Sequence, residues 1–198
     1  MKKRMTWIGN LLILSGLAVT LIVSLGLRQN DSAREGRLDA FAAIQAEAGA
    51  APNKLEAADV SPGSEIQDIE GILSIPTIDL KEPIMMGVDE SVLSTGLGAI
   101  EGMDAPGAPD GSYAIAGHQT YAFGEFFNRL DELEIGERFT FETTADILQY
   151  EIFDIQKVRP DQVEVLDRQP GLSLLSLITC YPKRSNEYRL VVQAKLIE

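Results

Sequence analysis

The sequence is poor in the residues that build disulfides and metal sites. Its 198 residues include one cysteine, Cys180, and one histidine, His118. A single thiol cannot form an internal disulfide, and one thiol with one imidazole offers few ligands for a metal site. The same two side chains can form a nucleophile and its proton-transfer partner if the fold brings them together. The alternative is a buried cysteine that acts as a small hydrophobic residue and a histidine with a structural role.

Positive charge is also scarce. The chain has 17 Lys and Arg against 30 Asp and Glu, which gives a net charge of −13. Three of the cations, Lys2, Lys3 and Arg4, precede a long apolar segment, so the remainder carries −13 − 3 = −16. Because a domain this acidic has no basic stripe to neutralise phosphates, we expect no nucleic-acid partner.

Charged side chains are absent from residues 7–27. A helix of that length covers ~31 Å, the thickness of the hydrocarbon core of a bilayer. With the basic cluster on the inner side, the sequence predicts a cytoplasmic tail at 1–6, a single-pass transmembrane anchor at 7–27 and an extracellular remainder. A cleaved signal peptide is the alternative, but its apolar region is normally ~7–15 residues long and ends in small residues. Leu25-Gly26-Leu27-Arg28 does not fit that cleavage pattern.

Residues 28–70 have the composition of a stalk. Residues 31–51 are rich in Ala, Glu, Arg and Gln, which is compatible with a helix that ends at Pro52. Residues 57–67 contain turn-forming and solvated side chains with little to bury. We therefore expect an extracellular stalk or linker at 28–70 and a folded domain at 71–198.

Short apolar or alternating runs follow one another from Gly71 onward. They predict strands at residues 72–75, 84–88, 111–117, 138–142, 147–158, 172–180 and 188–197, with one or two helical turns within 125–133. Many short strands with so little helix indicate an all-β fold, a closed or nearly closed β-barrel with one or two short helices.

The last two predicted strands place Cys180 close to Arg189. If they are neighbours joined by a loop at 181–188, the two backbones lie within about 5 Å of one another. The arginine is on the polar side of an apolar alternation, where its cation could favour a thiolate and stabilise an oxyanion. His118 follows Gly117 at the end of another strand. The chemistry these residues suit is acyl transfer through a thioester.

Three motifs in this order resemble the sortases, the cysteine transpeptidases of Gram-positive cell surfaces. The motifs are Ala116-Gly117-His118, Leu177-Ile178-Thr179-Cys180 and Arg189-Leu190-Val191-Val192, and the segment 158–167 also resembles the one that leads into the nucleophile strand of that family. The resemblance covers residues 71–198 and implies an eight-stranded β-barrel. It implies that Cys180 is the nucleophile, His118 the general acid/base and Arg189 the residue that stabilises substrate and oxyanion.

The resemblance also implies a reaction and its partners. A sortase cleaves a Leu-Pro-x-Thr-Gly-type signal of a surface protein between Thr and Gly. It then passes the acyl group from the cysteine to an amine, usually that of a lipid II-type peptidoglycan precursor, which anchors the protein to the cell wall. Thr179 is expected to support the site. Five apolar residues are expected to line the groove for the signal, although each could equally be barrel core: Ala116, Val163, Val165, Leu166 and Ile178.

Two features bear on the class of sortase. Pilus-assembling sortases carry a lid with an Asp-Pro-aromatic motif and often a C-terminal membrane helix, and neither is seen in this sequence. A housekeeping, class A-like or class D-like enzyme is therefore expected. The alternative is a pilus-type, class C-like enzyme, because Cys180-Tyr181-Pro182 with Asn186 resembles the nucleophile loop of that class.

A metal cofactor is not expected. Some class A members bind calcium through acidic residues before the histidine strand and before the cysteine strand. Asp110 matches one of these positions, but Met103, Pro106 and Arg168 occupy the others. The resemblance therefore implies neither a cofactor nor calcium activation here.

Other functions fit the residues less well. Papain-like wall peptidases place cysteine before histidine, and L,D-transpeptidases place the two close together in a Ser-His-Gly-Cys arrangement. Here His118 comes first and Cys180 is distant in sequence. A non-catalytic, membrane-tethered β-barrel scaffold stays open, and it predicts a buried thiol that does not react in the folded state.

Overall fold

The computed structural model describes residues 13, 15–18, 20, 35–43, 45, 69–119, 126–183 and 185–197. The predicted membrane anchor at 7–27 and the stalk at 28–70 lie largely outside these residues. The described residues before position 46 are helical. None of the helices in the described part of the chain has the length and apolar character needed to cross a membrane. The chain divides into two units, residues 1–37 and 38–198, and the barrel belongs to the second.

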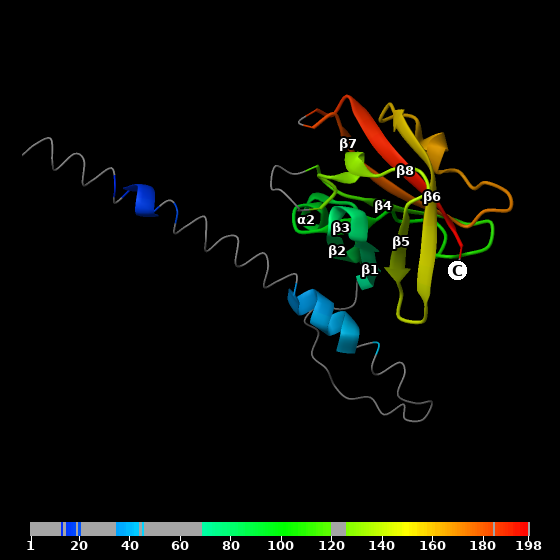
Figure 1. Ribbon diagram of the computed structural model, residues 1–198, viewed down its shortest axis with the longest axis horizontal. Coiled ribbons are helices and arrows are strands. Elements are labelled where there is room, and N and C mark those ends of the chain that lie inside the picture. Colours follow the sequence, from blue (N-terminus) through cyan, green and yellow to red (C-terminus); the bar gives the residue numbers. More distant parts are fainter. Residues whose placement is uncertain are drawn as a thin grey trace, which may run out of the picture. The chain divides into compact units, whose positions relative to one another are not determined.

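Eight strands form a closed barrel in the order β1-β2-β3-β4-β7-β8-β6-β5 (Figure 1). This confirms the predicted all-β, eight-stranded barrel. The strands are β1 (Ile69–Ile75), β2 (Leu80–Met86), β3 (Leu97–Ala99), β4 (Ser112–Ala116), β5 (Arg138–Glu142), β6 (Ile147–Val158), β7 (Leu174–Tyr181) and β8 (Tyr188–Leu196). The described helices from residue 69 onward are short: η1 (Pro76–Ile78), α2 (Glu90–Leu93), η2 (Leu130–Glu132) and η3 (Val163–Leu166).

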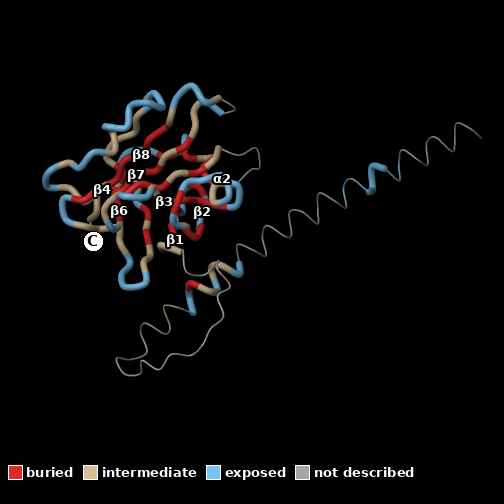
Figure 2. The backbone as a smooth tube through the Cα atoms, turned by 180° about the vertical axis from the view of Figure 1, so that it is seen from behind, coloured by how far each residue is buried: buried red, intermediate tan, exposed pale blue. Residues whose placement is uncertain are grey.

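Alternation along each strand separates a core face from an outer face. On β8, Leu190, Val192 and Ala194 are buried in the core, as the sequence pattern predicts. Figure 2 shows the burial concentrated on the strands and the exposure on the connecting loops. Each fully buried Leu, Ile or Phe contributes about 1.5–3 kcal/mol, so this core fixes which residues of a strand face outward. Arg189, one residue before Leu190, faces outward.

Two strands that run in the same direction bring the end of β4 to the end of β7. β4 pairs with β7 in parallel over five residues, from Ser112 opposite Leu174 to Ala116 opposite Ile178. Because parallel strands end at the same edge of a sheet, the residues that follow Ala116 lie beside the last residues of β7. This topology brings His118 and Cys180 together although they are 62 positions apart in the sequence.

Some local predictions were less accurate. The helical turns expected within 125–133 reduce to η2, three residues long, and residues 120–125 lie outside the described residues. β1 begins at Ile69, two residues before the expected start of the domain. Strand β3 was not predicted, and Pro83 lies within β2, opposite Ile72 of β1. The proline is tolerated there because pairing of β2 with β3 begins only at Ile84.

Candidate active site

Cys180 and Arg189 face each other across two neighbouring strands. They form a direct cross-strand pair of β7 and β8, the penultimate residue of one strand opposite the second residue of the other. Residues directly opposite in an antiparallel pair share a face. The predicted adjacency of the two residues is therefore confirmed, and both side chains lie on the outer face.

His118 reaches the same place from β4. The backbone N–H of Gly117 donates to the Ile178 carbonyl at 3.0 Å and so extends the β4–β7 ladder one residue past the strand. If the register of the two strands continues one residue further, His118 comes opposite Cys180 on the neighbouring strand. The His118 side chain is 42% exposed, which leaves it accessible to a substrate.

Gly117 explains the direction in which His118 points. A Cβ on this glycine would lie 2.3 Å from Leu97 Cδ2 and 2.9 Å from Phe127 Cδ2. Position 117 therefore faces the core, where only glycine fits between two buried side chains. The following residue is turned away from the core, toward the face that carries Cys180.

Thr179 ties the two strands together next to these residues. Its side chain is 2% exposed, and its hydroxyl donates to the Gly117 carbonyl at 2.8 Å. This bond joins the residue before the cysteine to the residue before the histidine. It is the type of contact expected of a side chain that supports the site.

The partners of His118 and Arg189 come from the loops around them. Nε2 of His118 lies 3.7 Å from Oε2 of Glu90, the first residue of α2. Nη1 of Arg189 donates to the carbonyls of Asn186 at 3.3 Å and Tyr188 at 3.1 Å. Within the described ranges no carboxylate pairs with Arg189, so its charge is not neutralised by the part of the protein that the structure shows.

The outer face next to Cys180 continues along β7 as a floor that is apolar at Ile178 and polar at Ser176. Two residues before Cys180, Ile178 lies between Ala116 of β4 and Val191 of β8. Two residues further, Ser176 lies opposite Gln193. Because two strand residues span about 6.6 Å, this floor extends about 13 Å from Cys180 to Ser176.

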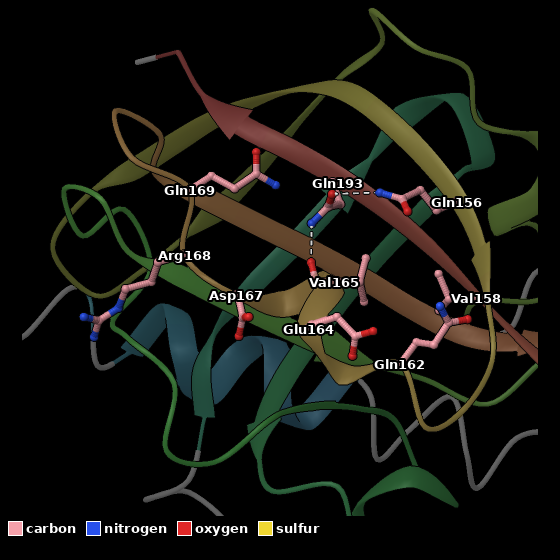
Figure 3. Close-up of a pocket in the computed structure, with 9 residues that line it drawn as sticks. All are labelled: Gln156, Val158, Gln162, Glu164, Val165, Asp167, Arg168, Gln169 and Gln193. Atoms are coloured by element: carbon pink, nitrogen blue, oxygen red, sulfur yellow. Dashed lines mark hydrogen bonds between the residues drawn. The ribbon is translucent and has the colours of Figure 1, made fainter.

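Helix η3 lies over the far end of that floor. The Ser112 hydroxyl donates to the Leu166 carbonyl at 2.8 Å, and Nε2 of Gln193 donates to the Val165 carbonyl at 2.8 Å. A groove of about 320 Å³ runs along the β6–β8 side of η3 (Figure 3). It is lined by Gln156, Val158, Gln162, Glu164, Val165, Asp167, Arg168, Gln169 and Gln193. Val158, one of the lining residues, pairs with Arg189 on β8, which in turn pairs with Cys180.

The five predicted groove residues fall into two groups: two lie on the outer face of β4 and β7, and three lie in η3. Ala116 and Ile178 are partners on the outer face, beside His118 and Cys180. The other three belong to η3, where Val165 lines the groove and Val163 is 68% exposed. Leu166 is half-buried. None of the five belongs to the central core cluster.

Arg168, one of the four positions considered for calcium, forms an ion pair. Arg168 lies beside Asp104, and its Nε donates to Oδ2 of that carboxylate at 2.7 Å. The Arg168 guanidinium lowers the pKa of Asp104 below its usual value. In the part of the chain that the structure describes, no group of three or more His, Cys, Asp or Glu side chains is placed to hold a metal ion.

Comparison with known proteins agrees with this geometry. The family model of the sortase domain matches residues 73–197. The chain belongs to the sortase family. It is 31% identical over 130 residues to sortase A of Streptococcus agalactiae, a match that covers 64% of this chain and 52% of that protein. It is 33% identical over 153 residues to sortase SrtE1 of Streptomyces coelicolor, covering 70% of this chain and 43% of that protein. This sortase chain thus spans about half the length of these two relatives.

Solved sortase structures share the barrel. A sortase C from Streptococcus pneumoniae superposes with a TM-score of 0.64 at 28% identity, covering 83% of this chain and 87% of that one. A lid mutant of sortase A from Corynebacterium diphtheriae gives a TM-score of 0.64 at 25% identity, covering 85% of this chain and 95% of that one. The neighbours therefore include both sortase A and sortase C proteins.

Several residues around the site of this sortase were not identified from the sequence. Glu90 beside His118 follows Asp89, which caps α2 by accepting from Ser91 N and Val92 N. The run Asp89-Glu90-Ser91 is a helix-start signal that could have been recognised. Gln193 lies on the outer face of β8, and its burial, 1% exposed, depends on η3 and could not be read from the alternation.

Proposed function

We propose that this chain is a membrane-anchored cysteine transpeptidase that cleaves a Leu-Pro-x-Thr-Gly-type signal and transfers the acyl part to an amine. The observation that carries the proposal is the meeting of three residues from three strands at one edge of the barrel. Cys180 and Arg189 are a cross-strand pair, and the β4–β7 ladder brings His118 alongside. Membership of the sortase family supports the same reaction.

In the first step, the Cys180 thiolate attacks the carbonyl carbon of the signal threonine. The carbonyl oxygen becomes an oxyanion next to the Arg189 guanidinium, whose planar fork suits it. The carbon–nitrogen bond to glycine then breaks as the His118 imidazolium gives its proton to the leaving amine. The products are a thioester on Cys180, a neutral imidazole and a free glycine amine.

In the second step, the acceptor amine attacks the thioester carbon. Neutral His118 takes a proton from the attacking nitrogen, a new amide bond forms, and Cys180 leaves as a thiolate. The enzyme returns to its starting protonation state. No oxidant, reductant or nucleotide is consumed, since the energy of the cleaved amide is retained in the thioester.

The floor of the groove suits the length of the signal. Four extended residues span ~13 Å, so a signal whose threonine is on Cys180 and which runs along β7 reaches to about Ser176. With its threonine on Cys180, the signal would place its middle residues over Ala116 and Ile178 and its first residue beside η3. We therefore assign Ala116, Ile178, Val163, Val165 and Leu166 to signal binding.

The natural substrates proposed are surface proteins that carry such a signal, with a lipid II-type peptidoglycan amine as acceptor. This assigns a housekeeping, class A-like or class D-like role. A pilus-type role is the second candidate, because a pilus-related sortase C of Group B Streptococcus is among the structural neighbours at a TM-score of 0.64. A pilin lysine as the preferred acceptor would favour the second role, and a peptidoglycan-type amine would favour the first.

Two further parts of the proposal concern location and cofactors. Residues 7–27 would anchor the chain with its N-terminus in the cytoplasm and its barrel outside. External protease acting on intact cells should then remove the barrel. We also propose that catalysis needs no calcium, since Arg168 supplies a cation beside Asp104. Chelation with EDTA should leave the rate unchanged.

Mass spectrometry of the protein with a Leu-Pro-Glu-Thr-Gly peptide tests the reaction. With the peptide alone, we expect an adduct on Cys180 that carries the peptide up to threonine. With oligoglycine or a diamino-acid amine added, this adduct should be converted to the transfer product. A folded protein whose thiol reacts with a mild alkylating reagent but forms no adduct would contradict the proposed substrate. A thiol inert to the reagent would favour the non-catalytic scaffold.

A further inference from the structure

Helix η3 has few contacts of its own that would fix its position on the barrel. It has four residues, none of them buried, and no side-chain cap at its N-terminus. A single 3₁₀ turn has few internal hydrogen bonds, and with no buried side chain it gains little from the hydrophobic effect. Its place over the outer face of the barrel must therefore depend on polar contacts with the rest of the domain.

Arg168, two residues after the helix, makes a contact through two nitrogen atoms. Its Nε and Nη2 donate to the two carboxylate oxygens of Asp104, the first at 2.7 Å. Oδ2 of Asp104 also accepts the backbone N–H of Ser112 at 2.9 Å. An arginine that engages both oxygens of a carboxylate fixes direction as well as distance, and here the carboxylate is itself held at the start of β4.

A second contact lies beside the first. Oδ1 of Asp110 accepts the backbone N–H of Gly171. Asp104 and Asp110 both belong to the loop between β3 and β4, whereas Arg168 and Gly171 both belong to the loop between β6 and β7. The two loops enclose a depression of about 350 Å³, which both aspartates and Arg168 line. The connection thus joins the loop before the histidine strand to the loop before the cysteine strand.

Arg168 lines one end of the groove, but its side chain does not lie over the glutamines at the other end. Figure 3 shows its side chain extending away from Gln193 and Gln156, while its backbone continues directly from η3. Its influence on a bound peptide would therefore pass through the wall formed by η3. The hydroxyl of Ser112, whose N–H binds Asp104, also donates to the Leu166 carbonyl, so the ion pair and the helix share one anchor point.

We propose that Arg168 and Asp104 are positioning residues that hold η3 over the signal-binding groove before the substrate arrives. This rests on the proposed function, because the groove matters only if the signal binds there. Because the ion pair already holds η3 in place, binding of the signal peptide does not incur the entropy cost of ordering this helix. Loss of the pair weakens binding of the signal and leaves the chemistry at Cys180 intact.

Steady-state kinetics of Arg168→Gln and Asp104→Asn test the role. We expect KM for the signal peptide to rise by up to about fivefold, the range that loss of one exposed ion pair produces, with kcat unchanged. Arg168→Lys should recover part of the loss, because it keeps the charge but not the two-pronged contact. The rate of Cys180 alkylation should match the parent protein in all three variants.

Arg138 provides a matched control. It donates through Nε and Nη2 to Glu151 at 3.1 and 2.9 Å, on β5 and β6, and its side chain is exposed to a similar degree. Arg138→Gln should leave both KM and kcat unchanged. A KM increase of the same size in this variant would mean that loss of any surface ion pair suffices, which would overturn the assignment.

Hydrogen exchange of the full chain gives a readout that needs no activity. Amides of residues 164–171 should exchange faster in Arg168→Gln and Asp104→Asn than in the parent, with β7 and β8 unchanged. Unchanged exchange together with unchanged KM would overturn the positioning role. If the parent protein forms no thioester, the proposed reaction is wrong. Faster exchange in the two variants would still show that the Arg168–Asp104 ion pair holds η3 in place.

Discussion

Arg189 has no carboxylate partner among the described residues, although it lies opposite Cys180, the proposed nucleophile. Its Nη1 is bound to two loop carbonyls, which orient the guanidinium without neutralising it. A charged group held in this way, next to a cysteine on the neighbouring strand, can stabilise an oxyanion as it forms. The geometry of the donor should therefore matter as much as its charge.

Arg189→Lys should be almost as damaging as Arg189→Ala. An ammonium keeps the charge but lacks the planar fork, and loss of one oxyanion donor costs about 100-fold or more in kcat. The measurement is kcat/KM for the signal peptide in both variants, with Arg138→Lys as the control. Full activity in the Lys variant would show that only a point charge is needed.

Thr179 offers a second test at the level of single atoms. Thr179→Val keeps the shape of a buried side chain but leaves the Gly117 carbonyl without its 2.8 Å donor. The free energy of unfolding should fall by about 1–3 kcal/mol, and kcat should fall because the strand end that carries His118 loosens. Thr179→Ser keeps the hydroxyl and should retain most of the activity. Urea unfolding and kcat together check both effects, and equal losses in the two variants would contradict the role of the hydrogen bond.

At the scale of elements, a strand is predicted well from the sequence when it is long enough to show apolar and polar residues in alternation. β5 and β6 were predicted with their observed bounds, and β8 to within one residue, because these strands alternate between core and outer face. β3 has three residues, all buried, so no alternation marks it. η3 was not predicted as a helix because its place depends on Ser112, Gln193 and Asp104, which are far away in sequence.

The same limit applies to the candidate site. The pairing of Cys180 with Arg189 followed from two consecutive strands joined by a loop, which is the commonest way for strands to become neighbours. The place of His118 requires the parallel pairing of β4 with β7, which periodicity does not reveal. Its adjacency to Cys180 therefore came from the resemblance to a family and not from the pattern of side chains.

Gly117→Ala tests the close packing at the end of β4. The added methyl would lie 2.3 Å from Leu97 Cδ2, and overpacking of this kind costs about 1–3 kcal/mol. Activity should fall with stability, because the strand end moves and carries His118 with it. Leu97→Val in the same chain removes the clashing atom, so the double variant should be less destabilised than the sum of the two single ones. Simple additivity in urea unfolding would contradict the clash.

At the scale of the whole molecule, three carboxyl groups among the described residues make the stability depend on acid pH. The pKa values of Asp89, Asp104 and Glu132 are lowered, mainly by side-chain hydrogen bonds from Ser91, Arg168 and Arg129 respectively. Their contribution is complete above the unfolded pKa of about 4 and is lost as the pH falls through the lower folded values. Urea unfolding should show stability falling below about pH 5. The fall should be shallower in Asp104→Asn, and an unchanged slope in that variant would contradict the linkage.

Two buried tyrosines, Tyr113 and Tyr150, make the stability of the barrel depend on alkaline pH. Tyr113 of β4 packs against Phe141 with ring centroids 5.6 Å apart, and Tyr150 of β6 packs against Phe139 at 5.7 Å. Both phenylalanines belong to β5, which is not a sheet neighbour of β4, so the first contact crosses the core. Burial raises the pKa of Tyr150 to about 12 and that of Tyr113 further.

Raised tyrosine pKa values favour the protonated, folded state. Their stabilising effect is complete below the unfolded pKa of about 10 and disappears as the pH rises through the folded values. Absorbance at the tyrosinate band should therefore show fewer than the five tyrosines of the chain ionising near pH 10, with the remainder appearing only as the barrel unfolds. Tyr150→Phe and Tyr113→Phe should each remove one late group. Ionisation of all five near pH 10, with the circular dichroism of the barrel unchanged, would show that these rings are open to water and that the core of the barrel is not closed by them.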